Sequence, residues 1–430
     1  MRIPTSARSL PSTVCCSAIF VALLGASGCA TLRATVAAYD TGPRGIARPQ
    51  QQLRDALARA DFPVALAWRE DDELLRELSV GASSYYAAQF ARSAVLLDSA
   101  ALLADDRITK SVAGNALALI TNDLARPYQP RRTERLFISY YGMLSHVRLE
   151  QWEDAAVEAR RLSALLAQYA ADRTDSERAT HATLHYLAAV VFERAGERGE
   201  AQVAYRCARA LLAQQVERAR GNGTNGEGDV LVVVERGFVA HRATEAINLF
   251  LGDSDRDSLA PHRPRRGHDR DGDDDDDGGY WLSIALSSVR RAERVVGEPM
   301  LLVDGATVAS VRVAALLDEA TIADEGRERT ALLARAVARA AAKYVVTKAV
   351  RDKKGQVAGS IANIGASLLE RADNRSWHLL PQEITLLRVH APAGQRQLQL
   401  AIGSEERRIE LGPVSVRAGM VSITAVRLWR

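Results

Sequence analysis

The sequence predicts an α-dominated, multidomain protein, in which a helical-repeat domain precedes a mixed α/β domain and a small antiparallel β element at the C-terminus. Three observations support this prediction. Residues 62–220 show helical periodicity with few Gly or Pro breakers. After residue 228, short Val- and Leu-rich runs punctuated by Gly and Pro replace that pattern, as is typical of strands. The chain has 430 residues, of which 47% are hydrophobic, and this is enough for two or three domains.

The overall charge is close to neutral. Lys and Arg number 56 against 53 Asp and Glu, which leaves a net charge of +3. Such a balance excludes a strongly basic nucleic-acid-binding protein, and we expect no nucleic-acid partner. Subtracting five lysines from the 56 basic residues leaves 51 arginines.

The first 28 residues are expected to be a secretory signal. Arg2 and Arg8 precede an apolar run over residues 14–24. The segment Ala26-Ser-Gly-Cys29 then resembles a bacterial lipobox, although the lipobox pattern prefers Leu where this chain has Ala26. The resemblance implies that Cys29 becomes the acylated N-terminus; the alternative is ordinary signal cleavage, with Cys29 incidental.

Residues 29–61 are predicted to be a tether between the lipid and the first helix, because they carry scattered Gly and Pro and a polar Gln run. Ala30 follows the cysteine, as in the common pattern of outer-membrane lipoproteins. We therefore expect the protein to be held by lipid on the outer membrane, facing the periplasm. No segment after residue 30 has about 18 consecutive apolar residues, so no membrane-spanning helix is expected in the mature chain.

The region 62–220 is expected to form amphipathic helices and to fold as a unit of its own. The predicted helices cover residues 66–80, 83–104, 109–124, 133–149, 151–170, 176–195 and 198–220. Small and aromatic residues at Ala201, Tyr205 and Ala208 resemble the tetratricopeptide repeat (TPR). Spacings of 62 and 46 between Ser93, Ala155 and Ala201 differ from the usual repeat of about 34. The repeats would therefore be degenerate, and an irregular helical bundle is the alternative.

The mixed α/β domain is assigned to residues 229–372. Val230–Val234 and Trp281–Leu286 are strand candidates, and Asp304-Gly305 suits the tight turn of a hairpin. Helices are expected near 314–325, 328–351 and 355–372. An insertion at 252–279 has ten Asp and five Arg within 253–277, and it is expected to be disordered.

The last segment, 373–430, is expected to form a small β element of its own. Its candidate strands are 384–389, 397–402 and 421–426, where apolar and polar residues alternate.

Few residues suggest catalysis or metal binding. His181 and His185 share a helix face, but the Glu of a zinc-protease motif is missing after His181. The Asp run at 273–277 opens like a calcium loop, yet Ile284 stands where a bidentate Glu is needed. Cys207 is expected to be a buried apolar residue. We therefore predict no enzyme activity, no cofactor and no metal site.

Several segments together resemble an uncharacterised family of bacterial lipoproteins with TPR-like helices. They are Gly228–Gly237, Lys343-Tyr344, the Gly- and Ala-rich stretch 355–366 and the block Ala372-Asp-Asn-Arg-Ser-Trp-His-Leu-Leu-Pro381. The resemblance implies an envelope scaffold, and genomic context associates some members with outer-membrane activators of cell-wall synthases. Within the last block, Asp373, Arg375 and Trp377 are predicted to form a structural corner, with a partner-binding epitope as the alternative.

The predicted function is a lipid-anchored scaffold that binds a protein or peptide of the cell envelope in the concave groove of its helical repeats. Arginines near the best repeats are the candidate partner-binding residues: Arg132, Arg135, Arg148, Arg160 and Arg161. A regulator of peptidoglycan synthases is the alternative, and a hydrolase of envelope polymers is a minor one. The sequence predicts no particular oligomeric state.

Overall fold

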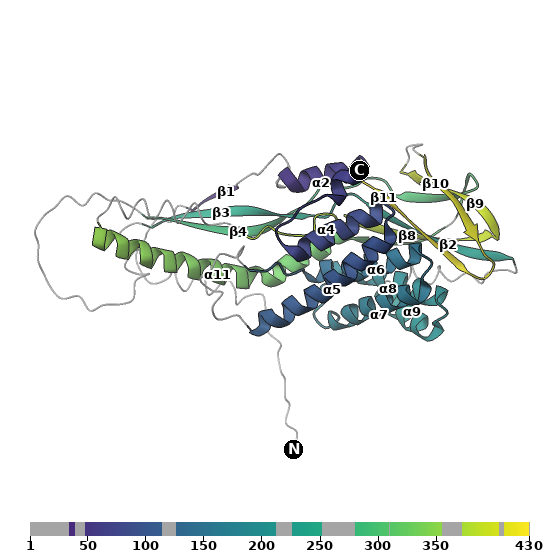
Figure 1. The fold of residues 1–430 in the computed structure, drawn as a ribbon, viewed down its shortest axis with the longest axis horizontal. Coiled ribbons are helices and arrows are strands. Elements are labelled where there is room, and N and C mark those ends of the chain that lie inside the picture. The colour runs from purple at the N-terminus through teal and green to yellow at the C-terminus, as the bar shows by residue number, and fades with distance from the viewer. Residues whose placement is uncertain are drawn as a thin grey trace, which may run out of the picture.

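The computed structural model describes residues 34–38, 48–113, 126–211, 226–251, 280–308, 310–354, 372–403 and 408–429. The predicted signal, the lipidation residue Cys29, the acidic insertion and the last predicted helix lie outside these residues. Within them, a helical layer packs on a β-sheet, a second sheet packs behind the first, and a long arm projects from this body (Figure 1). The chain is thus a helical region followed by α/β and β elements, as predicted at this level.

In the part of the chain that the structure describes, three helix pairs make the helical layer. They are α4 (Glu73–Tyr86) with α5 (Phe90–Ala113), α6 (Arg132–Arg148) with α7 (Trp152–Gln168), and α8 (Arg178–Arg194) with α9 (Arg198–Leu211). The short helices α2 (Arg48–Ala58) and α3 (Phe62–Leu66) precede them, and the 3-10 turn η2 (Asp175–Glu177) leads into α8. Within each pair the turn contains one residue of positive φ: Ala88, Glu150 or Gly196.

Among the described residues, eight strands form the two sheets of the body. One sheet has the order β11-β2-β8-β7, with β2 at Glu227–Arg236, β7 at Val311–Leu316, β8 at Glu383–Pro392 and β11 at Val421–Leu428. The other has the order β10-β9-β5-β6, with β5 at Pro299–Val303, β6 at Ala306–Thr307, β9 at Gly394–Ile402 and β10 at Arg408–Val416. Pairing is antiparallel throughout, except that β11 runs parallel to β2.

Strand β2 is buried on both faces, which explains its unbroken run of β-branched residues. Val230, Val232 and Val234 pack between the two sheets. Leu231 and Val233 belong instead to the core shared with the helices. Because successive side chains of a strand point to opposite faces, this one strand joins both cores.

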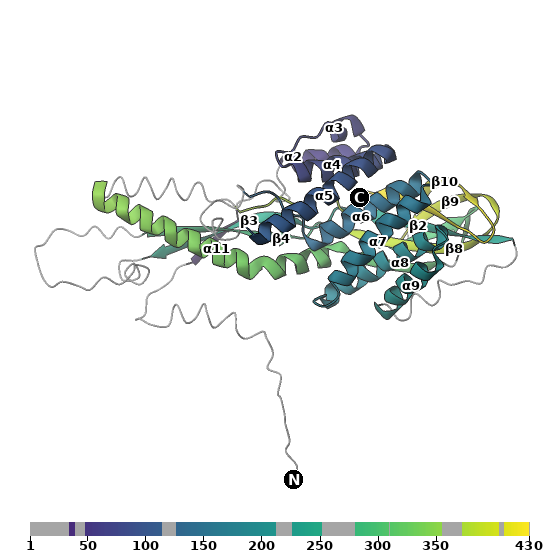
Figure 2. The same cartoon turned by 60° about the horizontal axis from the view of Figure 1, so that its bottom comes forward.

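The arm consists of a three-stranded sheet and a long helix. Its sheet has the order β1-β3-β4, with β1 at Ala34–Ala38, β3 at His241–Leu251 and β4 at Tyr280–Arg290. Helix α11 (Leu317–Lys354) begins with Leu317 fully buried in the body and then runs outward beside β4 (Figures 1 and 2). At 1.5 Å per residue, its 38 residues span about 57 Å. No helix of the described residues is long and apolar enough to cross a membrane.

Several strand predictions are confirmed. The candidates at 230–234 and 281–286 lie in β2 and β4, and the candidates in the last segment lie in β8, β9 and β11. Strands β5 and β6 form the predicted hairpin, with Asp304 and Gly305 at φ values of 51° and 82° in its turn. The predicted helices 314–325 and 328–351 are one helix, α11. Residues 314–316 of the first prediction belong instead to strand β7.

Two boundary predictions are wrong. The segment 373–430 does not form a β element of its own, because β8 pairs with β2 and β7, β9 pairs with β5, and β11 pairs with β2. The predicted tether contains helix α2, in which Leu53, Ala56 and Leu57 are buried. Their spacing of three and one residues is that of the buried face of a helix. The neighbouring Gln run led to the prediction of a polar tether instead.

The prediction that residues 62–220 fold alone also conflicts with the structure. Helices α4, α6 and α8 share one core with β2, β7, β8 and β11, and α8 lies directly against three of these strands. The surface that a helical-repeat groove would offer to a partner is therefore covered by the chain's own sheet.

We predict that residues 62–220 expressed alone keep their helical circular dichroism but lose the cooperative melt. The fragment exposes Tyr140, Tyr141 and Leu184, which are at most 1% exposed in the intact chain. Exposed apolar surface without fixed packing is typical of a molten state that binds hydrophobic dyes. The mature full-length chain is the control, and a sharp, dye-free transition in the fragment would contradict the shared core.

Candidate functional site: a buried charged junction

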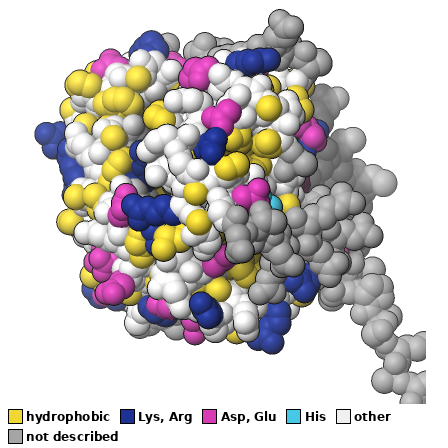
Figure 3. All heavy atoms as spheres, turned by 90° about the vertical axis from the view of Figure 1, so that its right-hand side faces the viewer, with side chains coloured by type: hydrophobic (Ala, Val, Ile, Leu, Met, Phe, Trp, Pro, Cys, Tyr) yellow, Lys and Arg dark blue, Asp and Glu magenta, His cyan; other side chains and the backbone are white. Residues whose placement is uncertain are grey.

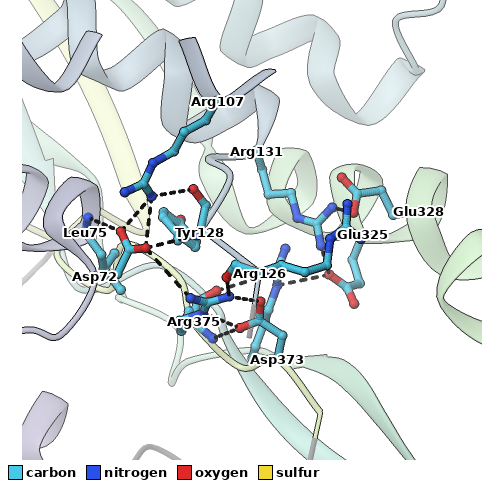
Figure 4. Close-up of polar contacts among 11 residues, drawn as sticks. Asp72, Leu75, Arg107, Arg126, Tyr128, Arg131, Glu325, Glu328, Asp373 and Arg375 are labelled. Carbon is cyan, nitrogen blue, oxygen red and sulfur yellow. Dashed lines mark hydrogen bonds and ion pairs between the residues drawn. The ribbon is translucent and has the colours of Figure 1, made fainter. Parts of the chain in front are cut away.

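A network of charged side chains lies where the helical layer, the base of the arm and the segment 372–381 meet (Figure 4). We call it the charged junction. Its members are Asp72, Arg107, Arg131, Glu134, Arg242, Glu325, Asp373 and Arg375. They come from the start of α4, the end of α5, the start of α6, strand β3, helix α11 and the 372–381 segment.

Asp72 organises the side of the junction that faces the first helix pair. Its carboxylate caps α4 by accepting a hydrogen bond from the Leu75 backbone N–H at 3.2 Å. It also accepts from the Tyr128 backbone N–H at 3.0 Å and from Arg107 Nη1 at 2.8 Å. Burial works to raise the pKa of Asp72, but these hydrogen bonds outweigh it and hold the pKa below its ordinary value.

The predicted structural corner lies beside Asp72. Arg375 Nε and Nη2 donate to the two carboxylate oxygens of Asp373 at 2.9 and 2.8 Å, and Nη2 also donates to the Arg126 carbonyl at 2.8 Å. Arg375 thus holds both a carboxylate and a main-chain carbonyl. Trp377 is 1% exposed, and its ring lies 5.7 Å from that of Tyr141 on α6. The tryptophan therefore fills the space between this segment and the helical layer.

Glu134 connects the corner to helix α6. Its Oε1 accepts from the Trp377 backbone N–H, and its Oε2 accepts from the Arg131 backbone N–H, each at 2.7 Å. The Arg131 side chain pairs with Glu325 and Glu328 of α11. Burial, together with the charge of neighbouring Arg242, lowers the pKa of Arg131 to about 10, so this guanidinium is still charged at neutral pH.

Arg242, on strand β3 of the arm, is the last member of the network. Its Nε lies 3.1 Å from Glu325 Oε2, and its Nη1 donates to the Arg375 carbonyl at 3.1 Å. The same arginine therefore touches α11 and the corner. With every carboxylate above engaged by a guanidinium or a backbone N–H, the arrangement is typical of a rigid joint between the body and the arm.

Metal-ligating groups do not gather in the part of the chain that the structure describes, where no cluster of three or more His, Cys, Asp or Glu could hold an ion. His181 and His185 are buried between α8 and its neighbours, and burial lowers the pKa of each to about 4. Both imidazoles are therefore neutral at pH 7. Cys207 is partly exposed on α9, not buried as predicted.

The arginines predicted to bind a partner contact this chain's own side chains. Arg132 forms a two-pronged pair with Asp172 at 2.8 and 2.6 Å, and Arg135 pairs with Asp105 at 2.6 Å. Arg160 pairs with Glu197, Arg161 pairs with Glu158 at 2.8 Å, and Arg148 lies over the Phe90 ring at 4.9 Å. The ion pairs of Arg132, Arg135 and Arg160 join different helices or loops, whereas the pair of Arg161 with Glu158 lies within α7. Partner binding through these arginines stays a prediction.

A second buried network was not predicted from the sequence. Glu235 of β2 is 1% exposed and points into the helical layer, where Tyr140 OH and Tyr86 OH donate to it at 2.9 and 3.0 Å. Tyr86 and Tyr141 share a further hydrogen bond of 2.6 Å. Burial raises the pKa of Glu235 despite the nearby Arg427 guanidinium. The only sequence signal was a charged residue ending an apolar strand, which usually marks the strand's solvated end.

Searches for relatives found no matching family model, no matching curated protein and no matching solved structure.

We predict that Asp72→Asn lowers the free energy of unfolding at pH 7 by about 1–2 kcal/mol, because a charge-assisted cap and an ion pair weaken together. An unfolded Asp titrates near pH 4, and the pKa of folded Asp72 is lower, so its charged form stabilises the fold above that pH. That contribution disappears as pH falls through the folded pKa.

The difference between wild type and Asp72→Asn should therefore shrink when denaturant unfolding is repeated near pH 3. Asp106→Asn is the matched control, since Asp106 is an exposed residue of α5 that pairs only with Lys110 among the described residues. Its effect at pH 7 should stay within about 0.5 kcal/mol. A constant difference between pH 7 and pH 3 would show that the charge of Asp72 is not what stabilises the junction.

Proposed function

We propose that the protein is a lipid-anchored scaffold of the bacterial cell envelope, and that its helix pairs are divergent TPR units. All three pairs close with the same backbone turn, in which a residue of positive φ follows the first helix. The next N–H then bonds back five residues: Gln89 to Ser84, Gln151 to His146 and Glu197 to Phe192. Such recurrence of one local geometry supports repetition of a single structural unit.

Small residues at the helix contacts support the same proposal. Ala155, Ala159 and Ala208 are completely buried. A Cβ at Gly81 would lie 3.1 Å from the Leu97 side chain, which indicates close packing of α4 on α5. Close approach of paired helices through small residues is what the TPR-like sequence pattern requires.

A partner would bind the outer surface of the helix pairs and not their concave side. The inner helices α4, α6 and α8 are committed to the sheet, whereas the outer helices α5, α7 and α9 carry exposed apolar residues. These are Val95 and Leu102 on α5, Val157 on α7 and Val203 on α9, with exposed fractions of 46–70%. The coverage of the inner face by the sheet is the observation that carries this assignment.

Site-specific photo-cross-linking in cells tests the binding surface. A photoreactive residue at Val95, Val157 or Val203 is expected to give one discrete protein adduct of the same size. Val296 and Met420 are matched control positions, because they are exposed apolar residues outside the helix pairs. Adducts of equal yield at the control positions, or none on the outer helices, would refute this surface.

Lipid anchoring is tested separately. Cys29→Ser removes the thiol that a diacylglycerol thioether requires, so the mature chain should move from the membrane fraction to the soluble periplasmic fraction. Two or three acyl chains anchor a protein stably, whereas none are left in this variant. Cys207→Ser is the control and should stay in the membrane fraction. Unchanged anchoring of Cys29→Ser would mean that no lipid on Cys29 holds the protein to the membrane.

A further inference from the structure

Strand β11 lies at one edge of its sheet and pairs only with β2 among the described strands. The two strands run parallel, and the ladder is unbroken along β11. The Asp229 N–H donates to the Met420 carbonyl at 2.9 Å at one end, and the Gly237 N–H donates to the Leu428 carbonyl at 2.8 Å at the other. The even-numbered residues of β11 therefore direct their backbone N–H and C=O groups toward β2.

The odd-numbered residues of β11 direct their backbone groups away from the sheet, because successive residues of a strand alternate. Within the described part of the chain, no hydrogen bond reaches the N–H or C=O of Ile423, Ala425 or Arg427 from that side. All three residues are partly exposed. The Arg427 side chain is only 4% exposed, so solvent reaches mainly the backbone of this residue. We call the backbone groups of these three residues the open edge.

The other edge strands of the two sheets carry features that discourage pairing with a further strand. Strand β10 has a register shift between Glu410 and Gly412, followed by Pro413, which has no N–H to donate. Strand β6 has two residues, and strand β7 carries the charged Arg312. Residues 421–426 of β11 contain no Pro, no Gly and no charge, and their ladder has no bulge.

The composition of β11 favours strand pairing. Val421, Ile423, Thr424 and Val426 are β-branched, and such residues fit a pleated, half-buried surface. A regular, uncharged edge with free backbone donors and acceptors is a template for another extended strand. The chemistry of the open edge therefore selects a strand as its partner.

The end of the body opposite the arm offers a different kind of surface. There, hydrophobic, basic and acidic side chains intermingle (Figure 3). The buried core of a stable interface is depleted of charged residues, so this face is poorly suited to self-association through side chains. Backbone pairing at the open edge does not depend on an apolar patch.

The open edge is self-complementary about Ala425. In an antiparallel pair centred there, Ala425 would lie opposite Ala425 of a second copy, and Ile423 opposite Arg427. These residues all point outward, so each pair can exchange backbone hydrogen bonds. Arg427 is the only charged residue of the strand and would meet an isoleucine, so like charges do not face each other. On the other face of the strand, Thr424 would meet Val426.

We propose that the protein forms a two-fold symmetric dimer, in which the open edges of two copies pair antiparallel. The occupant of the edge is a second copy of this chain, and the two four-stranded sheets become one continuous sheet across the axis. Closed two-fold association is the commonest form of self-assembly, and here it leaves no unpaired edge at β11. The inference does not rest on the proposed scaffold function.

Sedimentation velocity tests the dimer. The protein is residues 29–430 with Cys29→Ser, and it is expected to sediment with twice the mass of one chain at micromolar concentration. Ala425→Pro removes the outward N–H at the centre of the pairing but no hydrogen bond to β2, and proline is tolerated where the N–H faces away from its sheet. Thr424→Lys adds a charge of the kind that protected edges carry.

Each of these two variants should raise the dissociation constant of the dimer about tenfold or more, because backbone hydrogen bonds between the copies are lost or crowded by charge. Thr307→Lys is the matched control, since Thr307 is an exposed threonine of the edge strand β6. It should leave the mass of the parent unchanged. Circular dichroism and the melting temperature confirm that each variant is folded.

Disulfide trapping tests the register of the pairing. In the same chain with Cys207→Ser, Ala425→Cys places two thiols opposite each other, with Cα atoms about 5.5 Å apart, which suits a disulfide. Mild oxidation is expected to give a covalent dimer. Ser422→Cys is the matched control on the same strand, because its two copies would lie about 20 Å apart and should not cross-link.

The proposal is overturned if the parent is monomeric, if both edge variants dimerise as strongly as the parent, or if Ser422→Cys cross-links as well as Ala425→Cys. A monomeric parent whose photoreactive residue at position 424 captures a different protein in cells would assign the open edge to a strand of that protein. A cross-link between two copies has the mass of two chains, which distinguishes it from the adduct expected on the outer helices.

Discussion

Strand β2 is the element on which the rest of the structure depends. Its even-numbered valines lie between the two sheets, and its odd-numbered residues lie against the helices. At its end, Glu235 brings a carboxylate into the helical layer, where Tyr86 and Tyr140 donate hydrogen bonds to it and the Arg427 guanidinium lies 3.9 Å away. A buried carboxylate is tolerated only when such partners surround it, and removal of one partner costs several kcal/mol. The sheet and the helices are therefore coupled by packing and by a polar contact that neither part can satisfy alone.

The charged junction plays the corresponding role between the body and the arm. Arg242 on β3, Arg131 at α6 and Glu325 on α11 form one ion-pair chain, and the corner at Asp373 and Arg375 closes it. Because Arg131, Arg242 and Glu325 each have more than one partner, rotation of the arm would break several contacts together. A stiff joint of this kind would hold the arm at a set angle to the body.

Within the proposed scaffold, these two couplings decide which surfaces are free. The chain fills the inner side of its helix pairs with its own sheet, so recognition is left to the outer helices. The arm carries β1, which pairs with β3.

Local structure followed from the sequence where periodicity and turn chemistry are strong. The helices from α6 to α9, the buried strand β2 and the Asp304-Gly305 hairpin were all predicted, because each depends on nearby residues. The pairing of Arg375 with Asp373 was predictable for the same reason, since the two are two residues apart. Tertiary structure alone decided that β8 lies between β2 and β7, that α2 packs on the body and that Glu235 meets Tyr86 and Tyr140. Those contacts join residues that are up to several hundred positions apart, and they depend on burial in a shared core that no local pattern encodes.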